Sequence, residues 1–311
     1  MMNLATTLRS ARRRGLPLGV GLLALLLVAV GCDSEDLGDA NPETPSVADY
    51  VGQVSAMSTL NSAVQEAGGL SVDLENEEIT MFAPLNGAFE PAIDPSLNRP
   101  VMRKVLEHHI VSGTVTSDQL TDGQSVTPVS GQNLSIGIGD AVTVNRATVT
   151  NANANASNGV VHVIDGLLIN AVDRAALTPQ FTLFARLVGE ANLGNALQQA
   201  GANDGRTIFA PTNEAILDLL DANGNDQLEN DEIPSNAADI LQYHVLDSVF
   251  LAGEVPTSET AVPTLEGTDL TVVRDGEAVT LNPNEEDASV TIPNVEVDNG
   301  VIHGIDTVLT P

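Results

Sequence analysis

One string of twelve residues occurs twice in the chain, and this repetition constrains the fold more than any other feature. It reads NGVVHVIDGLLI at 158–169 and NGVIHGIDTVLT at 299–310. A second string lies upstream of each copy, MFAPLNGAFE at 81–90 and IFAPTNEAIL at 208–217. Paired strings at the start and end of each half indicate an internal duplication, so the chain is predicted to contain two copies of one domain.

The spacing of the strings shows where the halves differ in length. The interval between the upstream and downstream strings is fourteen positions longer in the second half (299 − 208 against 158 − 81). His109 in LEHHIV matches His244 in LQYHVL and divides this gain. Eight positions are gained before the histidine (244 − 208 against 109 − 81) and six after it (299 − 244 against 158 − 109).

Both strings carry the signs of buried strands. Val160, Val161 and Val163 form a β-branched run bounded by Asn-Gly and Asp-Gly. This pattern is typical of a largely buried strand that follows a tight turn. Pro84 and Pro211 should end the upstream strands, because proline donates no ladder hydrogen bond. The asparagine two positions after each proline is expected to cap a helix.

These strings, TxFAPxNxAF and NGVxHxID with a His-His or Tyr-His pair between them, resemble the two signature boxes of fasciclin-type adhesion domains. The match covers both halves, over about residues 47–311. Leu85 and Ile216 depart from the usual threonine and phenylalanine, and His108 stands where the second half has Tyr243. The resemblance implies an α+β fold, with a small β-wedge and packed helices in each repeat. It also implies binding rather than catalysis.

Hydrophobic spacing predicts the remaining elements of the first half. Apolar residues recur at helical intervals over 47–67, and two glycines then end the pattern. A short helix is expected at 101–110. Alternating apolar and polar residues over 125–153 predict a meander of short strands, and the Asn/Ala-rich segment 151–158 is expected to be a loop.

The N-terminus predicts an exported lipoprotein. Four arginines precede an apolar stretch at 16–30, which suits a signal peptide and is too short for a typical membrane span. The stretch ends in Ala-Val-Gly-Cys, which resembles the bacterial lipoprotein box, so Cys32 would carry the lipid. An ordinary secretory signal with a chance cysteine is the alternative. The predicted organisation is a signal peptide at 1–31, an acidic flexible tether at 32–46, domains at 47–171 and 178–311, and a short linker at 170–178.

The chain is strongly acidic, with 12 basic and 42 acidic residues and a net charge of −30. Nucleic-acid binding needs a positive surface, so this class is excluded. The chain has no tryptophan and two tyrosines, too few rings for stacking on sugars or single strands. The expected location is the bacterial envelope, in the outer membrane or at the cell surface. The expected partners are unidentified envelope, matrix or cell-surface proteins or polysaccharides.

The histidines raise the question of catalysis. His162 and Asp165 lie three positions apart on a predicted strand, so they point to opposite faces and are poorly placed for acid–base work. The second half repeats the pair as His303 and Asp306. We expect each histidine to make hydrogen bonds within its own domain.

His109 and His244 could meet these strands across the fold, where a structural contact is favoured over a metal site. A nucleophile is missing, because no GxSxG string occurs and the lipid occupies the one cysteine. HExxH, GxxxxGK and GxGxxG strings are absent as well. We therefore expect a protein that is not an enzyme.

The positions gained before His244 fall within a possible calcium loop, Asp221–Glu232. Oxygen donors occupy the alternate positions that an EF-hand uses, and hard cations require such donors. Asp226 replaces the usual glycine at position 6, and Pro234 delays the exiting helix. An acidic solvated insertion without metal is the alternative. The predicted ligands are Asp221, Asn223, Asn225, Gln227 (through its carbonyl), Glu229 and Glu232.

Two functional classes follow from the sequence. The first is an adhesion or matrix-binding lipoprotein of the envelope, acting through two fasciclin-like domains. The alternative is a periplasmic structural or assembly module without an outward partner. An enzyme that uses the histidines is a third, weaker class.

Overall fold

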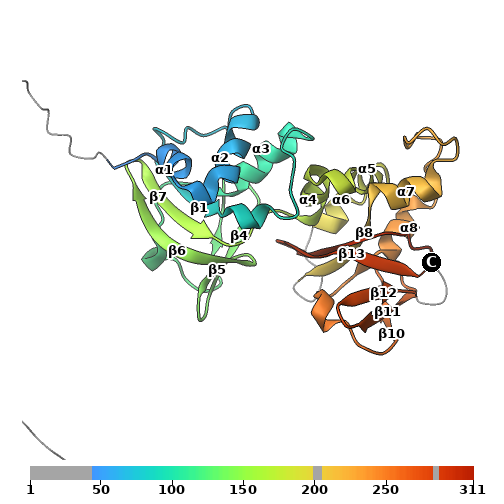
Figure 1. Ribbon diagram of the computed structural model, residues 1–311. Coiled ribbons are helices and arrows are strands. Elements are labelled where there is room, and N and C mark those ends of the chain that lie inside the picture. Colours follow the sequence, from blue (N-terminus) through green and yellow to red (C-terminus); the bar gives the residue numbers. More distant parts are fainter. Residues whose placement is uncertain (1–43, 199–204, 283–286) are drawn as a thin grey trace, which may run out of the picture. The chain divides into compact units, whose positions relative to one another are not determined.

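Each half of the chain forms a seven-stranded sheet with helices beside it (Figure 1). The computed structural model describes residues 44–198, 205–282 and 287–311. The predicted signal peptide, the predicted lipidation site Cys32 and nearly all of the predicted tether lie outside these ranges. Each sheet forms a nearly closed wedge, which confirms the predicted α+β fold.

The first repeat, residues 44–169, begins with helices and ends with the strand of the downstream string. Its elements are α1 (Val47–Gln53), η1 (Ser55–Met57), α2 (Ser58–Glu66), β1 (Ile79–Pro84), η2 (Asn86–Phe89), α3 (Arg99–His108), β2 (Ile110–Ser112), η3 (Ser117–Gln119), β3 (Ser125–Val126), β4 (Leu134–Ile138), β5 (Val142–Val144), β6 (Ala147–Ala156) and β7 (Gly159–Ile164).

The second repeat, residues 170–311, follows the same order with a longer helix after its first strand. Its elements are α4 (Ala171–Leu177), η4 (Pro179–Phe181), α5 (Thr182–Glu190), α6 (Gly194–Gln198), β8 (Arg206–Pro211), α7 (Asn213–Leu220), α8 (Ala237–Tyr243), β9 (Val245–Leu246), η5 (Ala252–Glu254), β10 (Thr260–Pro263), β11 (Asp269–Asp275), β12 (Ala278–Leu281), β13 (Ala288–Val297) and β14 (Gly300–Ile305).

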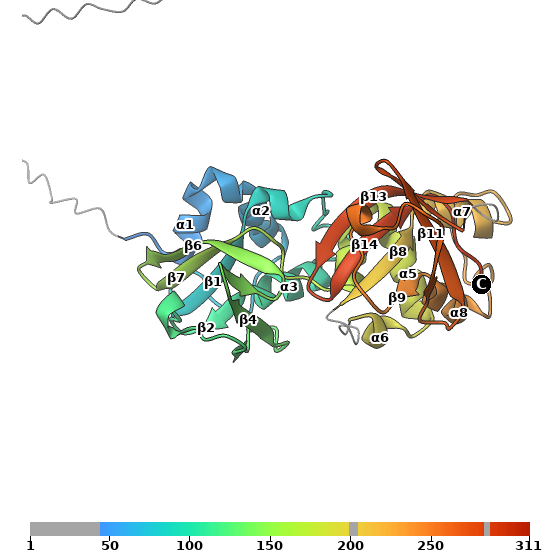
Figure 2. The ribbon, with the colours of Figure 1, turned by 90° about the horizontal axis from the view of Figure 1, so that it is seen from below.

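The two signature strings become neighbouring strands in each sheet. The strand orders are β2-β1-β7-β6-β5-β4-β3 and, read in the same direction, β9-β8-β14-β13-β12-β11-β10. β1 pairs in parallel with β7, and β8 with β14, whereas the other pairs are antiparallel. Figure 2 shows β1 beside β7 and β14 beside β8. The downstream strings therefore sit inside the sheets, where both edges of the strand are paired.

Side chains of the central strands alternate between two apolar layers. Met81 and Val161 belong to the core that also contains the helices, whereas Phe82 and Ile164 belong to the core inside the curled sheet. The second repeat divides its residues in the same way, with Ile208 on the helix side. A strand with both faces buried reads as a continuous apolar run, which explains the run in the sequence.

The predicted loop at 151–158 is wrong, because β6 continues through Ala156. Asn155 pairs with Val160 and Ala154 with Val161, on either side of a turn at 157–158. The pairing shifts register twice, and Asn153 adopts a positive φ of 58°. Asparagine tolerates this left-handed conformation, so an Asn-rich strand can contain bulges without losing its partner.

The predicted continuous helix at 47–67 is also wrong. Val54 is extended, with φ −89° and ψ 107°, and it separates α1 from η1 and α2. Asn86 holds this break, because its amide donates to the Ser55 carbonyl and accepts from the Thr59 N–H. The asparagine that we expected to cap its own helix therefore caps the start of the preceding helix.

The second repeat uses Asn213 in the same way, accepting from the Leu183 N–H and donating to the Pro179 carbonyl. Its following helix α7 is capped instead by Thr212, whose hydroxyl accepts from Ala215 N–H at 3.2 Å. In the first repeat the corresponding segment is only the 3₁₀ turn η2, with no side-chain cap at Leu85.

The segment 170–178 is a helix rather than a simple linker. Asn170 caps α4 by accepting the N–H groups of Val172 and Asp173, as Ser46 caps α1 by accepting the N–H of Asp49. Residues 43–311 form one compact unit, and polar contacts link α4 to the first repeat, among them the Asp94 N–H that donates to the Leu177 carbonyl at 2.7 Å. Lys104 Nζ lies 2.8 Å from Asp173 Oδ2, and Arg174 Nη2 lies 2.7 Å from the Pro91 carbonyl. The segment therefore serves as the first helix of the second repeat.

Within the described ranges, no helix has the length and apolarity needed to cross a membrane.

Candidate functional site

The Asn-Gly pair at the start of each downstream strand joins three parts of a repeat. Asn158 accepts the Val47 N–H at 2.9 Å and donates to the carbonyls of Leu74 and Glu77. Asn299 accepts the Ala171 N–H at 2.9 Å and donates to the Leu197 carbonyl. These contacts tie the first helix of each repeat to its last hairpin.

The glycine that follows each asparagine is required by space as well as by conformation. Gly159 and Gly300 have φ of 151° and 144°. A Cβ atom would lie 1.8 Å from the Ile79 carbonyl oxygen at Gly159, and 1.9 Å from the Arg206 carbonyl oxygen at Gly300. Both obstacles are backbone atoms of the neighbouring parallel strand, so no rotamer change could relieve the overlap.

His109 and His244 are buried and reach the segment after the last strand. His109 Nε2 accepts the Leu168 N–H at 2.9 Å, so the neutral ring carries its proton on Nδ1 and donates to the Val105 carbonyl at 2.8 Å. His244 repeats both bonds, to the Leu309 N–H and the Ile240 carbonyl. Each ring therefore joins the preceding helix to the segment after the last strand of its repeat.

His162 and His303 hold the bulged strand against a loop. His162 Nδ1 accepts the Asn153 N–H at 3.3 Å and its Nε2 donates to the Val115 carbonyl at 2.9 Å. His303 makes the same contacts with Asn294 and Phe250. Each ring also stacks on a phenylalanine of the neighbouring strand, with centroids 5.5 Å and 5.7 Å apart. All four signature histidines thus use both ring nitrogens inside their own repeat.

The aspartates of the signature are separate from the histidines. Asp165 Oδ1 accepts the Thr148 N–H at 2.6 Å, and Asp306 Oδ1 accepts the Ser289 N–H at 2.8 Å. These bonds close the last hairpin of each repeat. No His–Asp pair forms within either string, so neither string forms an acid–base pair.

Burial favours the neutral form of His109, His162 and His303. Burial lowers the pKa of His109 to about 3, although its hydrogen bond to the Val105 carbonyl acts in the opposite direction. Burial likewise lowers the pKa of His162 and of His303. His109 protonates only in strong acid and faces backbone groups, so it is a structural element.

Two asparagines of this network were not identified from the sequence. Asn153 and Asn294, both with positive φ, present their N–H groups to the histidine rings. Their separation equals that of the downstream strings (294 − 153 = 299 − 158). Comparing the halves at that offset would have identified them before the structure.

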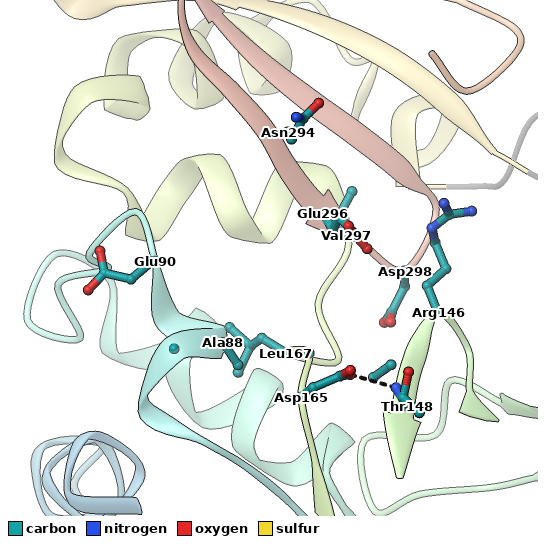
Figure 3. Close-up of a pocket in the computed structure, with 13 residues that line it drawn as sticks. Ala88, Glu90, Arg146, Thr148, Asp165, Leu167, Asn294, Glu296, Val297 and Asp298 are labelled. Atoms are coloured by element: carbon teal, nitrogen blue, oxygen red, sulfur yellow. Dashed lines mark hydrogen bonds between the residues drawn. The ribbon is translucent and has the colours of Figure 1, made fainter. Parts of the chain in front are cut away.

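A polar cavity of about 440 Å³ lies beside Asp165 (Figure 3). It is lined by groups from both repeats, and its charged residues are Glu90, Arg146, Asp165, Glu296 and Asp298. No histidine, cysteine or serine lines it. The four carboxylates and one guanidinium could bind polar groups, but they include no nucleophile with an adjacent base.

The predicted calcium loop adopts an ordered conformation. Asp221 Oδ1 accepts the N–H groups of Gly224 and Asn225, and its Oδ2 accepts that of Asp226 at 2.8 Å. Asp226 has φ of 59°, the left-handed conformation that position 6 of the pattern requires. Leu228 is buried, so the loop is anchored to the core at position 8.

The last residues of the loop close it on its start. Glu232 Oε1 accepts the Ala222 N–H at 3.0 Å, and its Oε2 accepts the Glu229 N–H at 2.9 Å. The amide groups of Asn223 and Asn225 donate to Glu229. Rotating both side-chain amides by 180° would point their oxygens, instead of their nitrogens, towards the Glu229 carboxylate. The backbone carbonyl of Gln227 is the remaining predicted donor, although no metal contact is present to define it.

Hydrogen bonding also affects the charge of the loop. Partial desolvation raises the pKa of Asp221, but the backbone N–H donors of the loop outweigh it, so the net pKa is lowered. In the described part of the chain, no cluster of three or more His, Cys, Asp or Glu side chains has the geometry of a metal site. The predicted ligand set includes two amides and one carbonyl, which are outside those residue types.

Comparisons with known proteins agree with the repeated strings. The fasciclin domain profile matches residues 55–170 and 179–311. Transforming growth factor-beta-induced protein ig-h3 from Oryctolagus cuniculus is 27% identical over 278 residues, covering 86% of this chain and 38% of that protein. Periostin from Homo sapiens is 28% identical over 269 residues, covering 81% of this chain and 31% of that protein. The chain spans about a third of the length of these two relatives.

A bacterial relative and a solved structure show similarity as well. Protein sll1483 from Synechocystis sp. is 36% identical over 121 residues, covering 36% of this chain and 66% of that protein. The FAS1 domain pair of the insect cell adhesion molecule fasciclin I is 21% identical with a TM-score of 0.39, covering 82% of this chain and 97% of that one. Because the fasciclin profile matches both repeats and most of the chain, the chain belongs to the fasciclin family as a tandem pair of fasciclin domains.

Proposed function

We propose that this protein is a non-catalytic binding lipoprotein of the bacterial envelope. Fasciclin domains are typically adhesion or binding modules, and this chain has two. The observation that carries the proposal is the internal use of the signature side chains. His109, His162, His244 and His303 each bond to groups of their own repeat, which leaves the surface and the loops for recognition.

The proposed anchor is a lipid on Cys32. The support is the sequence Ala-Val-Gly-Cys at the end of an apolar leader. Cys32→Ser should move the protein from the detergent-requiring membrane fraction to the soluble fraction, with Ser34→Ala as the matched control. If the Cys32→Ser protein stays in the membrane fraction, the lipid anchor is wrong.

The proposed partner is a protein or polysaccharide of the envelope, the matrix or another cell surface. Protease added to intact cells should remove an outward-facing protein and spare a periplasmic one, which separates the two functional alternatives. Microspheres coated with the secreted chain, meaning the chain without its predicted signal peptide and without lipid, should be retained on a film of native envelope material more strongly than albumin-coated microspheres. Equal retention of the two would contradict a binding function.

We also propose a structural calcium ion in the loop 221–232. The supporting observations are the left-handed Asp226 and the capture of three loop N–H groups by Asp221. The ion would be held by the carboxylates of Asp221, Glu229 and Glu232, two amide oxygens and one carbonyl. It would offset the repulsion among these carboxylates, with an affinity of about 10⁻⁴–10⁻³ M, as in extracellular modules.

Calcium titration of the secreted chain tests this site. Calcium should raise the Tm of the second repeat, and Asp221→Ala combined with Glu232→Ala should abolish the rise. The matched control is Asp118→Ala with Asp140→Ala, two exposed aspartates of the first repeat. An equal rise in the first repeat, or a rise that survives the double substitution at the loop, would mean general charge screening and no site.

A further inference from the structure

An apolar cleft opens between α7 and α8, the helices that flank the insertion. Both helices pack on α5. Its floor consists of buried side chains that include Ile216 and Leu241, and its walls include Leu220, Pro234 and Ile240. Figure 1 shows α7 and α8 at the base of the loop that joins them.

One wall of the cleft is unusually exposed. Leu219 lines the cleft and is 52% exposed, more than the other exposed large apolar residues of the described chain, Leu97 at 44% and Ile138 at 41%. The enclosed space is only about 20 Å³, so it holds the tip of one side chain. Any further contact must spread over the exposed walls, as it does when a helix lies in an apolar groove.

The walls that α7 and α8 contribute to the cleft, and the insertion between them, are acidic, and the neighbouring Arg186 of α5 is already bonded to the Leu228 carbonyl and the Asn230 side chain. The stretch from Asn213 to Tyr243, which supplies both walls and the insertion, contains eight acidic residues and no lysine or arginine. Asp218 and Asp239 are exposed and directly adjoin the cleft residues Leu219 and Ile240. An apolar groove with an acidic rim is complementary to a segment that combines aliphatic and basic side chains.

The same charge argues against two other occupants. A second copy of this chain carries the same net charge of −30 and the same acidic rim, so the two rims would repel each other. An anionic lipid surface would be repelled by the rim as well. The complementary occupant is therefore a cationic partner protein.

We propose that the α7–α8 cleft docks an amphipathic, basic helical segment of a partner protein. The segment inserts one aliphatic side chain beside Leu219, and its lysines or arginines face the acidic rim. This inference rests on the proposed binding function, for which it names one surface and the chemistry of one partner. The first repeat has only η2 in place of α7 and lacks the insertion, so it provides no such cleft.

A synthetic peptide of leucine and lysine, with all leucines on one helical face, tests the proposal. Fluorescence anisotropy should show that it binds the secreted chain and that binding weakens as salt is added. A twin peptide with glutamate in place of lysine, and a scrambled peptide with dispersed leucines, should not bind. Leu219→Gln should weaken binding about tenfold, because it removes an apolar contact at the centre of the interface. Leu97→Gln is the matched control and should have no effect.

The rim is tested separately. Asp218→Asn with Asp239→Asn should weaken binding and reduce its salt dependence, whereas Asp118→Asn with Asp140→Asn should do neither. Unchanged binding by Leu219→Gln, equal binding of the scrambled peptide, self-association of the chain in sedimentation, or binding to zwitterionic vesicles in place of the peptide would overturn the proposal. If the peptide fails while coated microspheres are still retained on envelope material, only the docking surface is wrong. If both fail, the proposed function is wrong as well.

Discussion

The two repeats keep the same polar framework and differ in what they attach to it. His109 and His244 bond to residues that are equivalent at fixed offsets, and so do His162 and His303. After the first central strand, however, the first repeat has the four-residue turn η2, and the second has the eight-residue helix α7 followed by the insertion.

The difference shows which part of the fold tolerates change. Hydrogen bonds to buried backbone groups fix the central strands, because an unpaired buried group would cost about 1–3 kcal/mol. The segment after the first strand faces solvent at its far end, so added residues cost little. Recognition is therefore expected to diverge between the repeats while the central strands stay alike.

The largest loss of stability should come from substituting the glycines of the parallel strand pairs. Gly159→Ala and Gly300→Ala should each destabilise their own repeat by about 4 kcal/mol or more, because Cβ would overlap a backbone oxygen. Urea denaturation can follow each repeat separately, since Tyr50 is in the first and Tyr243 in the second and the chain has no tryptophan. A Tyr→Phe substitution in the other repeat isolates each signal.

Helical glycines provide the controls for this test. Gly52 and Gly189 are exposed, with no atom within 4 Å of an added Cβ. Alanine there should leave stability unchanged or raise it by up to about 1 kcal/mol. A small loss at Gly159 with a large one at Gly300, or the reverse, would show that the strand pairs of the two repeats are not equivalent.

The next largest loss of stability is expected from substituting the buried histidines His109 and His244. His109→Leu should cost about 3 kcal/mol, because it leaves the Leu168 N–H and the Val105 carbonyl without partners. His244→Leu should cost a similar amount in the second repeat. Gln65→Leu, at an exposed helical position, should change the urea midpoint little. Unequal losses at the two histidines would break the proposed equivalence.

The same histidines predict acid sensitivity. Because the folded pKa of His109 is lowered to about 3 from 6.5, the unfolded chain takes up a proton that the folded chain does not. Stability should be complete above pH 6.5 and fall as the pH drops towards 3, by about 1.4 kcal/mol per pH unit for this histidine. His162 and His303 act in the same direction. In the His109→Leu protein the slope of stability against pH should be smaller, and an unchanged slope would contradict this assignment.

The smallest effect concerns the helix that distinguishes the repeats. Thr212→Leu removes the cap of α7 and should cost about 1 kcal/mol, whereas Leu85→Thr in the first repeat creates no cap for η2 and should not stabilise it. Thr212→Ser should retain stability. A gain from Leu85→Thr would show that the first repeat can form the longer helix.

Most of the framework could be predicted from the sequence because each signature string occurs twice. The strings, the histidine offset and the β-branched runs were sufficient to predict two α+β domains with buried central strands. The break at Val54 could not be predicted, because a distant side chain, Asn86, stabilises it. The strand through Asn155 was missed because asparagine has low strand propensity, which the pairing with Val160 overrides. The role of α4 depends on Asn299, which lies at the far end of the second repeat.

The parallel strand pair in each repeat has a consequence for how the chain acquires its structure. Ile79 pairs with Gly159 and Arg206 pairs with Gly300, so each pair joins positions that most of a repeat separates. Contacts that join such distant residues close late and slowly, because the intervening loop must lose its entropy first. A repeat that has not yet received its last strand lacks the centre of its sheet. Each repeat should therefore remain open during synthesis until that strand arrives, and the proposed export would then move an extended chain that does not first have to unfold.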